Sequence, residues 1–232
     1  MSEANQSRRV RGLRSLVPAS AWATLAQQGV RSHHRAQERL VNQGDSSGWV
    51  SLCLAGRLKV VYAEPDGREI MLAVRGPGDV IGELSWLDGH TRSATVQAIE
   101  PGITAKLSRK RFDELVQSLA IGGQMSSYML GKLRESAAHA WRLAHRTTAA
   151  RLTDLIAAFL DAAGPDHPCP TTIAMPQEEL ASTLGLARSA ITPVLAEWKA
   201  AGLITTGRGR LEVVDVSAFT GGPVSTSGQN RS

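Results

Sequence analysis

The chain has 232 residues, of which 42% are hydrophobic and 20% are charged, so it can bury a core and wholesale disorder is excluded. No apolar run approaches the roughly 18 residues of a membrane span, and the basic N-terminus lacks the apolar stretch of a signal peptide. We therefore expect a cytoplasmic protein without membrane segments. Two cysteines cannot form a disulfide framework, and no residues have the spacing of a metal site or of a nucleophile with its base. Neither an enzyme nor a metalloprotein is expected.

The formal net charge of +5 is unevenly distributed. Residues 106–146 carry eight basic and three acidic side chains, whereas residues 147–232 carry six basic and eight acidic ones. A basic balance is typical of proteins that bind nucleic acids, but a solvated basic helix face produces the same total. Charge alone leaves both interpretations open.

The first half of the chain predicts β structure after a flexible basic arm at residues 1–15 and a short helix at about 20–28. Between residues 38 and 107, short β-forming runs alternate with turns that contain glycine or proline. This pattern predicts an antiparallel sandwich or barrel. Within it, Pro65-Asp66-Gly67 predicts a hairpin.

After residue 108 the apolar residues recur at the three- to four-residue spacing of a helix. A short helix is expected up to Gly122-Gly123, which interrupt it, and a long helix from about Gln124 to Arg146. The apolar or small residues of the long helix form a narrow stripe with charged flanks, comprising Met125, Met129, Leu133, Ala137, Ala140 and Ala144. Such a stripe favours pairing with a second copy of the helix, and packing on the β domain is the alternative.

The last third predicts a helix-turn-helix. A helix at 147–162 ends at Gly164-Pro165, and a second helix, a turn at Gly185 and a third helix to about Ala201 follow. Two short β-runs flank Gly207-Arg208-Gly209-Arg210, which predicts a wing with a basic tip. A three-helix unit without a role in DNA binding is the alternative. Residues 219–232 are expected to be a disordered tail.

The segment from Gly78 to Val96 is the most informative for chemistry. It contains Gly-Glu-Leu at 82–84 and Arg-Ser-Ala-Thr at 92–95, with a short helical turn beginning at Glu83 and a strand restarting at Arg92. Arg92 can meet a phosphate with two parallel N–H bonds, and Glu83 can accept from a ribose hydroxyl. A simple ion pair between the two is the structural alternative.

With these residues in place, the chain resembles the cyclic-AMP receptor protein/FNR family of bacterial transcription regulators over roughly residues 16–217. The resemblance implies an α+β fold with a cyclic-nucleotide-binding β-roll (jelly roll) at 16–122, a dimerisation helix at 123–146 and a winged helix-turn-helix at 147–218. It further implies that Glu83 contacts the ribose, that Arg92 and Ser93 hold the cyclic phosphate, and that Gly82 and Leu84 supply backbone and wall.

The resemblance places the adenine-contacting pair at Ser136 and Ala137, of which only Ser136 has a hydroxyl. The base contact is thus only half kept. The resemblance implies cyclic AMP as the allosteric ligand, with cyclic GMP or a cyclic dinucleotide as alternatives. His90 lies near the predicted pocket and is interpreted as a solvated loop residue rather than a haem ligand.

The resemblance also implies a homodimer that binds double-stranded DNA and acts on RNA polymerase. The expected DNA contacts are Arg188, Ser189, Thr192, Lys199, Arg208 and Arg210. Pro193 departs from the family, and we expect the recognition helix to kink near Thr192 or to begin there. Because of this departure and the acidic C-terminal region, a regulator that works through a protein partner rather than through DNA is the alternative function.

Overall fold

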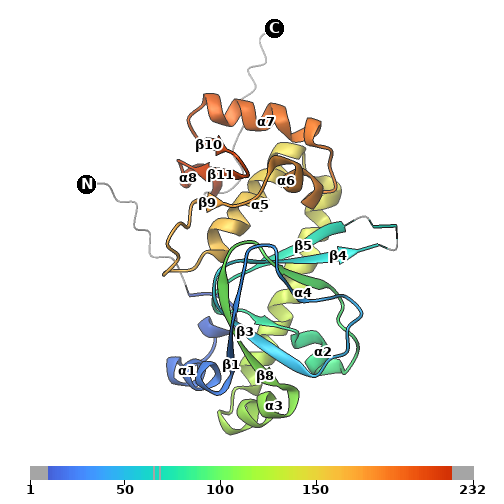
Figure 1. Ribbon diagram of the computed structural model, residues 1–232, viewed down its shortest axis with the longest axis vertical. Helices are drawn as coiled ribbons and strands as arrows, with labels where there is room; N and C mark the ends of the chain where they lie inside the picture. The colour runs from blue at the N-terminus through green and yellow to red at the C-terminus, as the bar shows by residue number, and fades with distance from the viewer. Residues whose placement is uncertain (1–9, 65, 68, 221–232) are drawn as a thin grey trace, which may run out of the picture.

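Two antiparallel sheets of four strands each form the N-terminal half of the protein, in the computed structural model that describes residues 10–64, 66–67 and 69–220 (Figure 1). The first sheet has the order β1-β8-β3-β6 and the second β2-β7-β4-β5. The strands are β1 (Val30–His34), β2 (Arg39–Val41), β3 (Trp49–Ala55), β4 (Leu58–Ala63), β5 (Glu69–Arg75), β6 (Val80–Ile81), β7 (Thr95–Ala98) and β8 (Gly102–Ser108). The predicted sandwich and the hairpin between β4 and β5 are confirmed, although Pro65 lies outside the described residues.

Alternation along β3 shows how the layers are held together. Val50 and Leu52 face one side and pack with the helices α1 (Ala19–Gln28) and α3 (Arg109–Ser118), whereas Cys53 faces the other sheet. Because successive side chains of a strand point to opposite faces, both faces of this sheet are covered. The β-domain therefore has one core between its sheets and another beneath its helices.

Several predicted boundaries were wrong. Residues 10–15 are not part of a flexible arm, because Leu13 in the 3₁₀ helix η1 (Leu13–Ser15) is fully buried; residues 1–9 lie outside the described range. Strand β1 was not predicted, since its polar sequence lacks an apolar period, yet it pairs with β8. Arg92 lies in a loop, and the strand restarts only at Thr95.

The long helix α4 (Gly122–His145) begins at the two glycines that were expected to interrupt a helix. Its first two turns are buried against the β-domain through Met125 and Tyr128, and most of the later residues are half-buried or exposed. The predicted stripe is therefore wrong at its N-terminal end, where Met125 belongs to the core of the β-domain.

The C-terminal domain is built from four helices and a three-stranded sheet of order β10-β11-β9 within the described residues. Its elements are α5 (Thr148–Ala162), β9 (Thr172–Ile173), α6 (Gln177–Thr183), α7 (Arg188–Ala200), β10 (Ile204–Gly207), β11 (Arg210–Val213) and α8 (Ser217–Thr220). Phe219 is buried and its ring packs edge-on against Trp198, so the predicted tail does not begin there. Residues 221–232 lie outside the described range.

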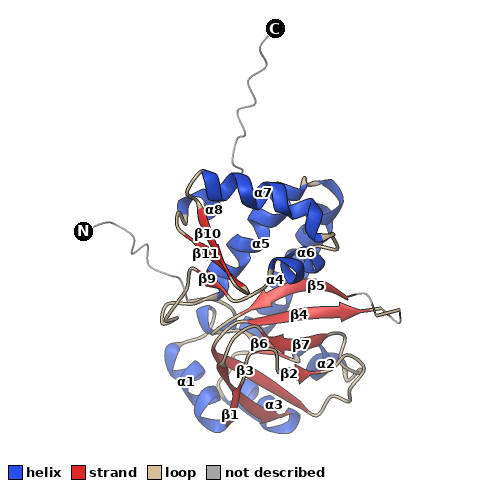
Figure 2. Ribbon diagram, turned by 45° about the horizontal axis from the view of Figure 1, so that its top comes forward, coloured by secondary structure: helices blue, strands red, loops and turns tan. Residues whose placement is uncertain are grey.

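The two domains share one continuous core. Met71, Val74 and Ile99 of the β-domain are buried in the same cluster as the apolar side chains of α5, α6 and α7. Gly76 permits this contact, because a Cβ there would overlap the carbonyl oxygen of Ala162 in α5. In Figure 2, α6 lies next to β5, while α7 lies at the end of the molecule away from the sandwich. No helix in the described part of the chain is long and apolar enough to span a membrane.

Candidate ligand pocket and helix-turn-helix

A cavity of about 290 Å³ opens between the second sheet, the short helix α2 (Glu83–Asp88), the loop before β7 and the long helix α4. All six predicted ligand-binding residues line it, namely Gly82, Glu83, Leu84, Arg92, Ser93 and Ser136. The cavity also contains three charged side chains that the sequence analysis did not assign to a ligand site, Arg75, Lys132 and Glu135. Residues from six separate segments therefore meet at one cavity.

Arg92 is a buried cation, with 3% of its surface exposed. Its Nη1 donates to the carbonyl of Gly82 at 3.0 Å, its Nη2 donates to the carbonyl of Trp49, and the guanidinium lies over the Trp49 ring. Its Nε is buried without a hydrogen-bond partner among the described residues. Burial lowers the pKa of Arg92, and the negative charges of Glu83 and Asp45 partly oppose this.

The backbone at Gly82 is shaped around Arg92. Gly82 has φ of 81°, a left-handed conformation that favours glycine, and it precedes the first residue of α2. A Cβ at this position would lie 2.1 Å from Nη1 of Arg92. The glycine of the Gly-Glu-Leu motif therefore allows the turn and also leaves room for the guanidinium.

Glu83 pairs with Lys132 rather than with Arg92. The Nζ of Lys132 lies 2.7 Å from Oε1 of Glu83 and donates to the carbonyl of Val80 at 3.1 Å. Burial lowers the pKa of Lys132, while the carboxylate of Glu83 raises it. This pair connects α2 to the long helix across the cavity.

A second ion pair crosses the cavity between β5 and α4. The Nη1 of Arg75 lies 2.9 and 3.0 Å from the two carboxylate oxygens of Glu135. Burial lowers the pKa of Arg75, but the carboxylates of Asp79 and Glu135 raise it further, so the net shift is upward. The sequence signal for Lys132 was its place on the flank of the helical stripe, which does not specify a partner, and Glu135 had no signal in the sequence analysis.

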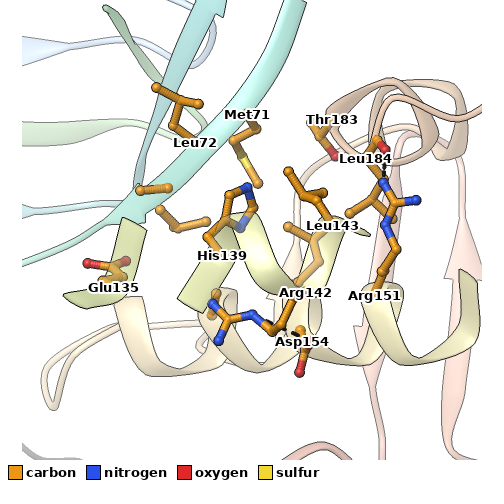
Figure 3. Close-up of a pocket in the computed structure, with 14 residues that line it drawn as sticks. Met71, Leu72, Glu135, His139, Arg142, Leu143, Arg151, Asp154, Thr183 and Leu184 are labelled. Atoms are coloured by element: carbon orange, nitrogen blue, oxygen red, sulfur yellow. Dashed lines mark hydrogen bonds and ion pairs between the residues drawn. The ribbon is translucent and has the colours of Figure 1, made fainter. Parts of the chain in front are cut away.

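A smaller cavity of about 70 Å³ lies between β5, the second half of α4, α5 and the end of α6 (Figure 3). Leu72, Ala73 and Glu135 line both cavities, so one wall separates the ligand pocket from the domain boundary. Figure 3 shows His139 beneath Met71 in this wall, and burial lowers the pKa of His139. On the far side, Arg151 donates to the carbonyl of Leu184, where α6 ends.

At Pro193 the structure excludes one of the two predicted outcomes, a helix that begins at Thr192. Helix α7 begins at Arg188 and runs on through Pro193, its sixth residue, so the helix does not begin at Thr192. Thr192 instead donates its hydroxyl to the carbonyl of Arg188 at 2.9 Å within the helix. Because proline has no N–H, the carbonyl of Ser189 lacks its usual hydrogen bond within the helix. Pro193 and Ser189 are both exposed, so water can solvate that carbonyl.

The predicted DNA-contacting side chains are accessible. All six are exposed on α7, on the turn after β10 or at the start of β11: Arg188, Ser189, Thr192, Lys199, Arg208 and Arg210. Arg188 occupies the first turn of α7, and the two wing arginines flank Gly209, which has a φ of 69° and lets the hairpin turn tightly. The helix and the wing thus present basic groups to solvent.

Comparisons with known proteins agree with this arrangement. Residues 31–118 match the model of the cyclic nucleotide-binding domain, and residues 148–220 match the Crp-like helix-turn-helix domain. The chain is 25% identical over 225 residues to the CRP-like protein Clp of Xanthomonas oryzae pv. oryzae, which covers 88% of this chain and 94% of that protein. The chain belongs to the cyclic-AMP receptor protein/FNR family. It is thus a cyclic nucleotide-binding, DNA-binding transcription regulator.

Other relatives define how far the similarity extends. The cAMP-activated global transcriptional regulator CRP of Salmonella typhimurium is 27% identical over 69% of this chain and 78% of its own length. The c-di-GMP responsive regulator CLP of Xanthomonas campestris shares the fold, with a TM-score of 0.67 and 22% identity over 84% of this chain and 99% of that one. Lysophospholipase nte1 of Aspergillus niger is 34% identical over 101 residues, but this chain spans only 7% of its length. The similarity to that enzyme is a partial match in the nucleotide-binding domain.

Proposed function

We propose that this regulator responds to a cyclic mononucleotide whose phosphodiester binds at Arg92, and that it acts on duplex DNA as a homodimer. The observation that carries the proposal is the charge of Arg92, which is buried and has no carboxylate partner among the described residues. A buried cation without a counter-ion is costly, and an anionic ligand would compensate it. The adjacent Ser93 adds a hydroxyl and a backbone N–H for the same phosphate.

The charge balance of the cavity supports a mononucleotide. Lys132 is paired with Glu83 and Arg75 with Glu135, so the ionised groups that line the cavity sum to one positive charge, that of Arg92. A cyclic mononucleotide carries one phosphodiester charge and neutralises it. A cyclic dinucleotide carries two such charges and is about twice as large, so it would leave one charge without a partner in this cavity of about 290 Å³.

The pair between Glu83 and Lys132 supports a route from ligand to helix. Glu83 is the acceptor next to Arg92 that a ribose hydroxyl would use, and its present partner, Lys132, belongs to α4. A ligand that binds at Arg92 and Glu83 therefore changes the electrostatic environment of a long-helix side chain. A ligand shifts a conformational equilibrium only through such differential contacts.

The exposed face of α4 supports self-association. Leu130, Leu133 and Trp141 are 52%, 66% and 57% exposed, and Ala137 and Ala144 lie between and beyond them at helical spacing. This face replaces the predicted stripe, whose Met125 and Met129 face the core and the ligand cavity. Covering it with a second copy of α4 would bury side chains that a monomer leaves in water.

The exposed basic residues of α7 and of the wing support a duplex partner. We assign Arg188, exposed at the start of α7, to base edges, and the exposed Arg208 and Arg210 to phosphates. Regulation of transcription then involves RNA polymerase, an assignment that rests on the family alone.

Calorimetric titration of the purified protein with cyclic AMP, cyclic GMP and cyclic di-GMP tests the ligand. We expect a cyclic mononucleotide to bind and Arg92→Ala to weaken its binding by a factor of about 30 or more, because a charge-assisted contact is lost. Arg111→Ala, at an exposed site on α3, is the matched control. If the Arg92→Ala variant has a native circular dichroism spectrum and unchanged affinity, the assignment of the phosphate site to Arg92 is wrong. Retention of specific genomic fragments in a gel shift would exclude the alternative that acts only through a protein partner.

A further inference from the structure

We propose that the base of the nucleotide is guanine and that Glu135 and Ser136 read its edge. This inference rests on the proposed function, since it needs the phosphate at Arg92 and the ribose near Glu83. Both residues line the ligand cavity on α4, and they follow Lys132, the partner of Glu83, by one helical turn. One turn is about 5.4 Å along the axis, which is the reach from a ribose to the far edge of its base.

The second sheet gives the cavity apolar surfaces beside the Arg75 guanidinium. Val60 on β4 and Leu72 and Ala73 on β5 line it and offer surfaces suited to the faces of a flat ring. Of the other polar side chains of the cavity, Arg92 and Ser93 are assigned to the phosphate, Ser85 donates to the carbonyl of Thr91 and Lys132 contacts Glu83. Selection between bases therefore falls to the polar groups on α4.

The two α4 side chains match the edge of guanine. An ionised carboxylate only accepts hydrogen bonds, whereas a hydroxyl both donates and accepts. Guanine presents two adjacent donors, N1–H and N2–H, beside one acceptor, O6. Glu135 can accept both donors while Ser136 donates to O6. Adenine presents an acceptor at N1, which a carboxylate at Glu135 would repel, and Ser136 alone cannot distinguish the two bases.

Glu135 retains acceptor capacity for this contact. Arg75 approaches it through a single nitrogen that is shared between both carboxylate oxygens, at 2.9 and 3.0 Å. A carboxylate has about four lone-pair sites, so positions on both oxygens stay free. The Glu135 side chain is 42% exposed, so it is accessible to a ligand, and its contact with the Arg75 guanidinium fixes its position at the cavity. Arg75 thus acts as a positioning residue for Glu135.

The test compares nucleotides that differ only in the base. Calorimetry with cyclic GMP, cyclic IMP and cyclic AMP should rank them in that order, with at least about a tenfold difference between the first and the last. Cyclic IMP isolates one contact, because hypoxanthine keeps N1–H and O6 but lacks the N2 amino group. Ser136→Ala should weaken both cyclic GMP and cyclic AMP by a similar factor.

Glu135→Gln is the decisive variant, because an amide offers one acceptor and one donor and so matches the N6 and N1 groups of adenine. We expect it to lower the ratio of cyclic GMP to cyclic AMP affinity by about tenfold or more. Glu135→Ala, as a second variant, should bring the two affinities within about threefold of each other. Glu114→Gln, at an exposed carboxylate on α3, should leave the ratio unchanged. Thermal unfolding curves show whether each variant is folded.

The outcomes separate the two proposals. If the native protein binds cyclic AMP as tightly as cyclic GMP, or more tightly, guanine recognition is overturned. An unchanged ratio of cyclic GMP to cyclic AMP affinity in Glu135→Gln has the same consequence. Neither result contradicts the phosphate pocket at Arg92. Failure of all three cyclic mononucleotides to bind overturns the proposed function itself. If cyclic di-GMP binds more tightly than cyclic GMP and cyclic AMP stays weak, the guanine assignment stands and the mononucleotide assignment falls.

Discussion

Arg57 Nη2 lies 2.6 Å from Oε2 of Glu100 and also donates to the carbonyl of Thr172 at 2.5 Å. Arg57 is completely buried, and it belongs with Glu100 to the β-domain, whereas Thr172 begins β9 of the C-terminal domain. His167, in the loop before β9, contacts the same carboxylate at 2.6 Å. The buried Arg57–Glu100 pair thus contacts the C-terminal domain directly and adds to the shared apolar core that holds the two domains together.

This cluster predicts an acid-sensitive stability. Burial raises the pKa of Glu100, but His167 and Arg57 lower it more, to about 2 from an ordinary value of 4.5. Because the folded pKa is below the unfolded one, the stabilisation is present above about pH 4.5 and is lost as the pH falls towards 2. It amounts to about 3 kcal/mol.

Urea denaturation at several pH values checks this prediction. Glu100→Gln should lower stability at pH 7 by about 3 kcal/mol, because Arg57 is left buried without a counter-ion, and should flatten the decline between pH 5 and pH 3. Glu114→Gln is the exposed control. An identical decline in native protein and Glu100→Gln would show that Glu100 does not carry the effect.

Trp141 tests the proposed dimer interface. Its ring stacks on His145 and is 57% exposed on the apolar face of α4. Trp141→Glu places a charge in that face and should raise the dimer dissociation constant by about 100-fold, since a central aromatic contact is lost and a charge is desolvated. Sedimentation velocity measures the change. Leu87→Glu, at an exposed leucine of α2, is the control and should leave the dimer intact. If Trp141→Glu forms a dimer as stable as that of the native protein, this face of α4 is not the dimer interface.

Pro193 is expected to cost stability. Alanine at this position would restore an N–H for the carbonyl of Ser189 and remove the clash of the proline ring with the preceding turn. We expect Pro193→Ala to raise the free energy of unfolding by about 1–3 kcal/mol. Chemical denaturation measures it, and Ala196→Ser at an exposed site of α7 serves as the control. No gain in stability would mean that the helix accommodates the proline without strain.

The wing arginines should act on phosphates rather than on bases. Arg208→Ala and Arg210→Ala should each weaken binding to all duplexes by a similar factor. Each should reduce the slope of log affinity against log salt by about 0.9 per phosphate contact, or about 1.8 for a homodimer that loses one contact in each subunit. Fluorescence anisotropy over a range of salt concentrations measures the slope. By contrast, Arg188→Ala should relax sequence preference in a selection from random duplexes. A wing variant that changes the selected sequence would place that arginine at a base edge.

The sequence by itself determined most of the order of the secondary-structure elements and the candidate ligand-binding residues of the Gly-Glu-Leu and Arg-Ser-Ala-Thr segments. Alternation and turn residues predicted the strands from β2 to β8, and helical periodicity predicted α3 to α7. The types and spacing of Glu83 and Arg92 indicated an anion pocket or an ion pair, and the family resemblance added the role of Gly82. These signals are local, because a period shows which face of an element is buried and a turn residue shows where the backbone must bend.

Only the tertiary structure decided which groups meet. Lys132 reaches Glu83 across 49 positions, and Arg75 reaches Glu135 across 60. Periodicity placed Met125 on the same stripe as Leu133, but packing buries the first and exposes the second. The reason is physical: an ion pair or a core contact depends on the relative placement of whole elements, which a local pattern in one element does not encode.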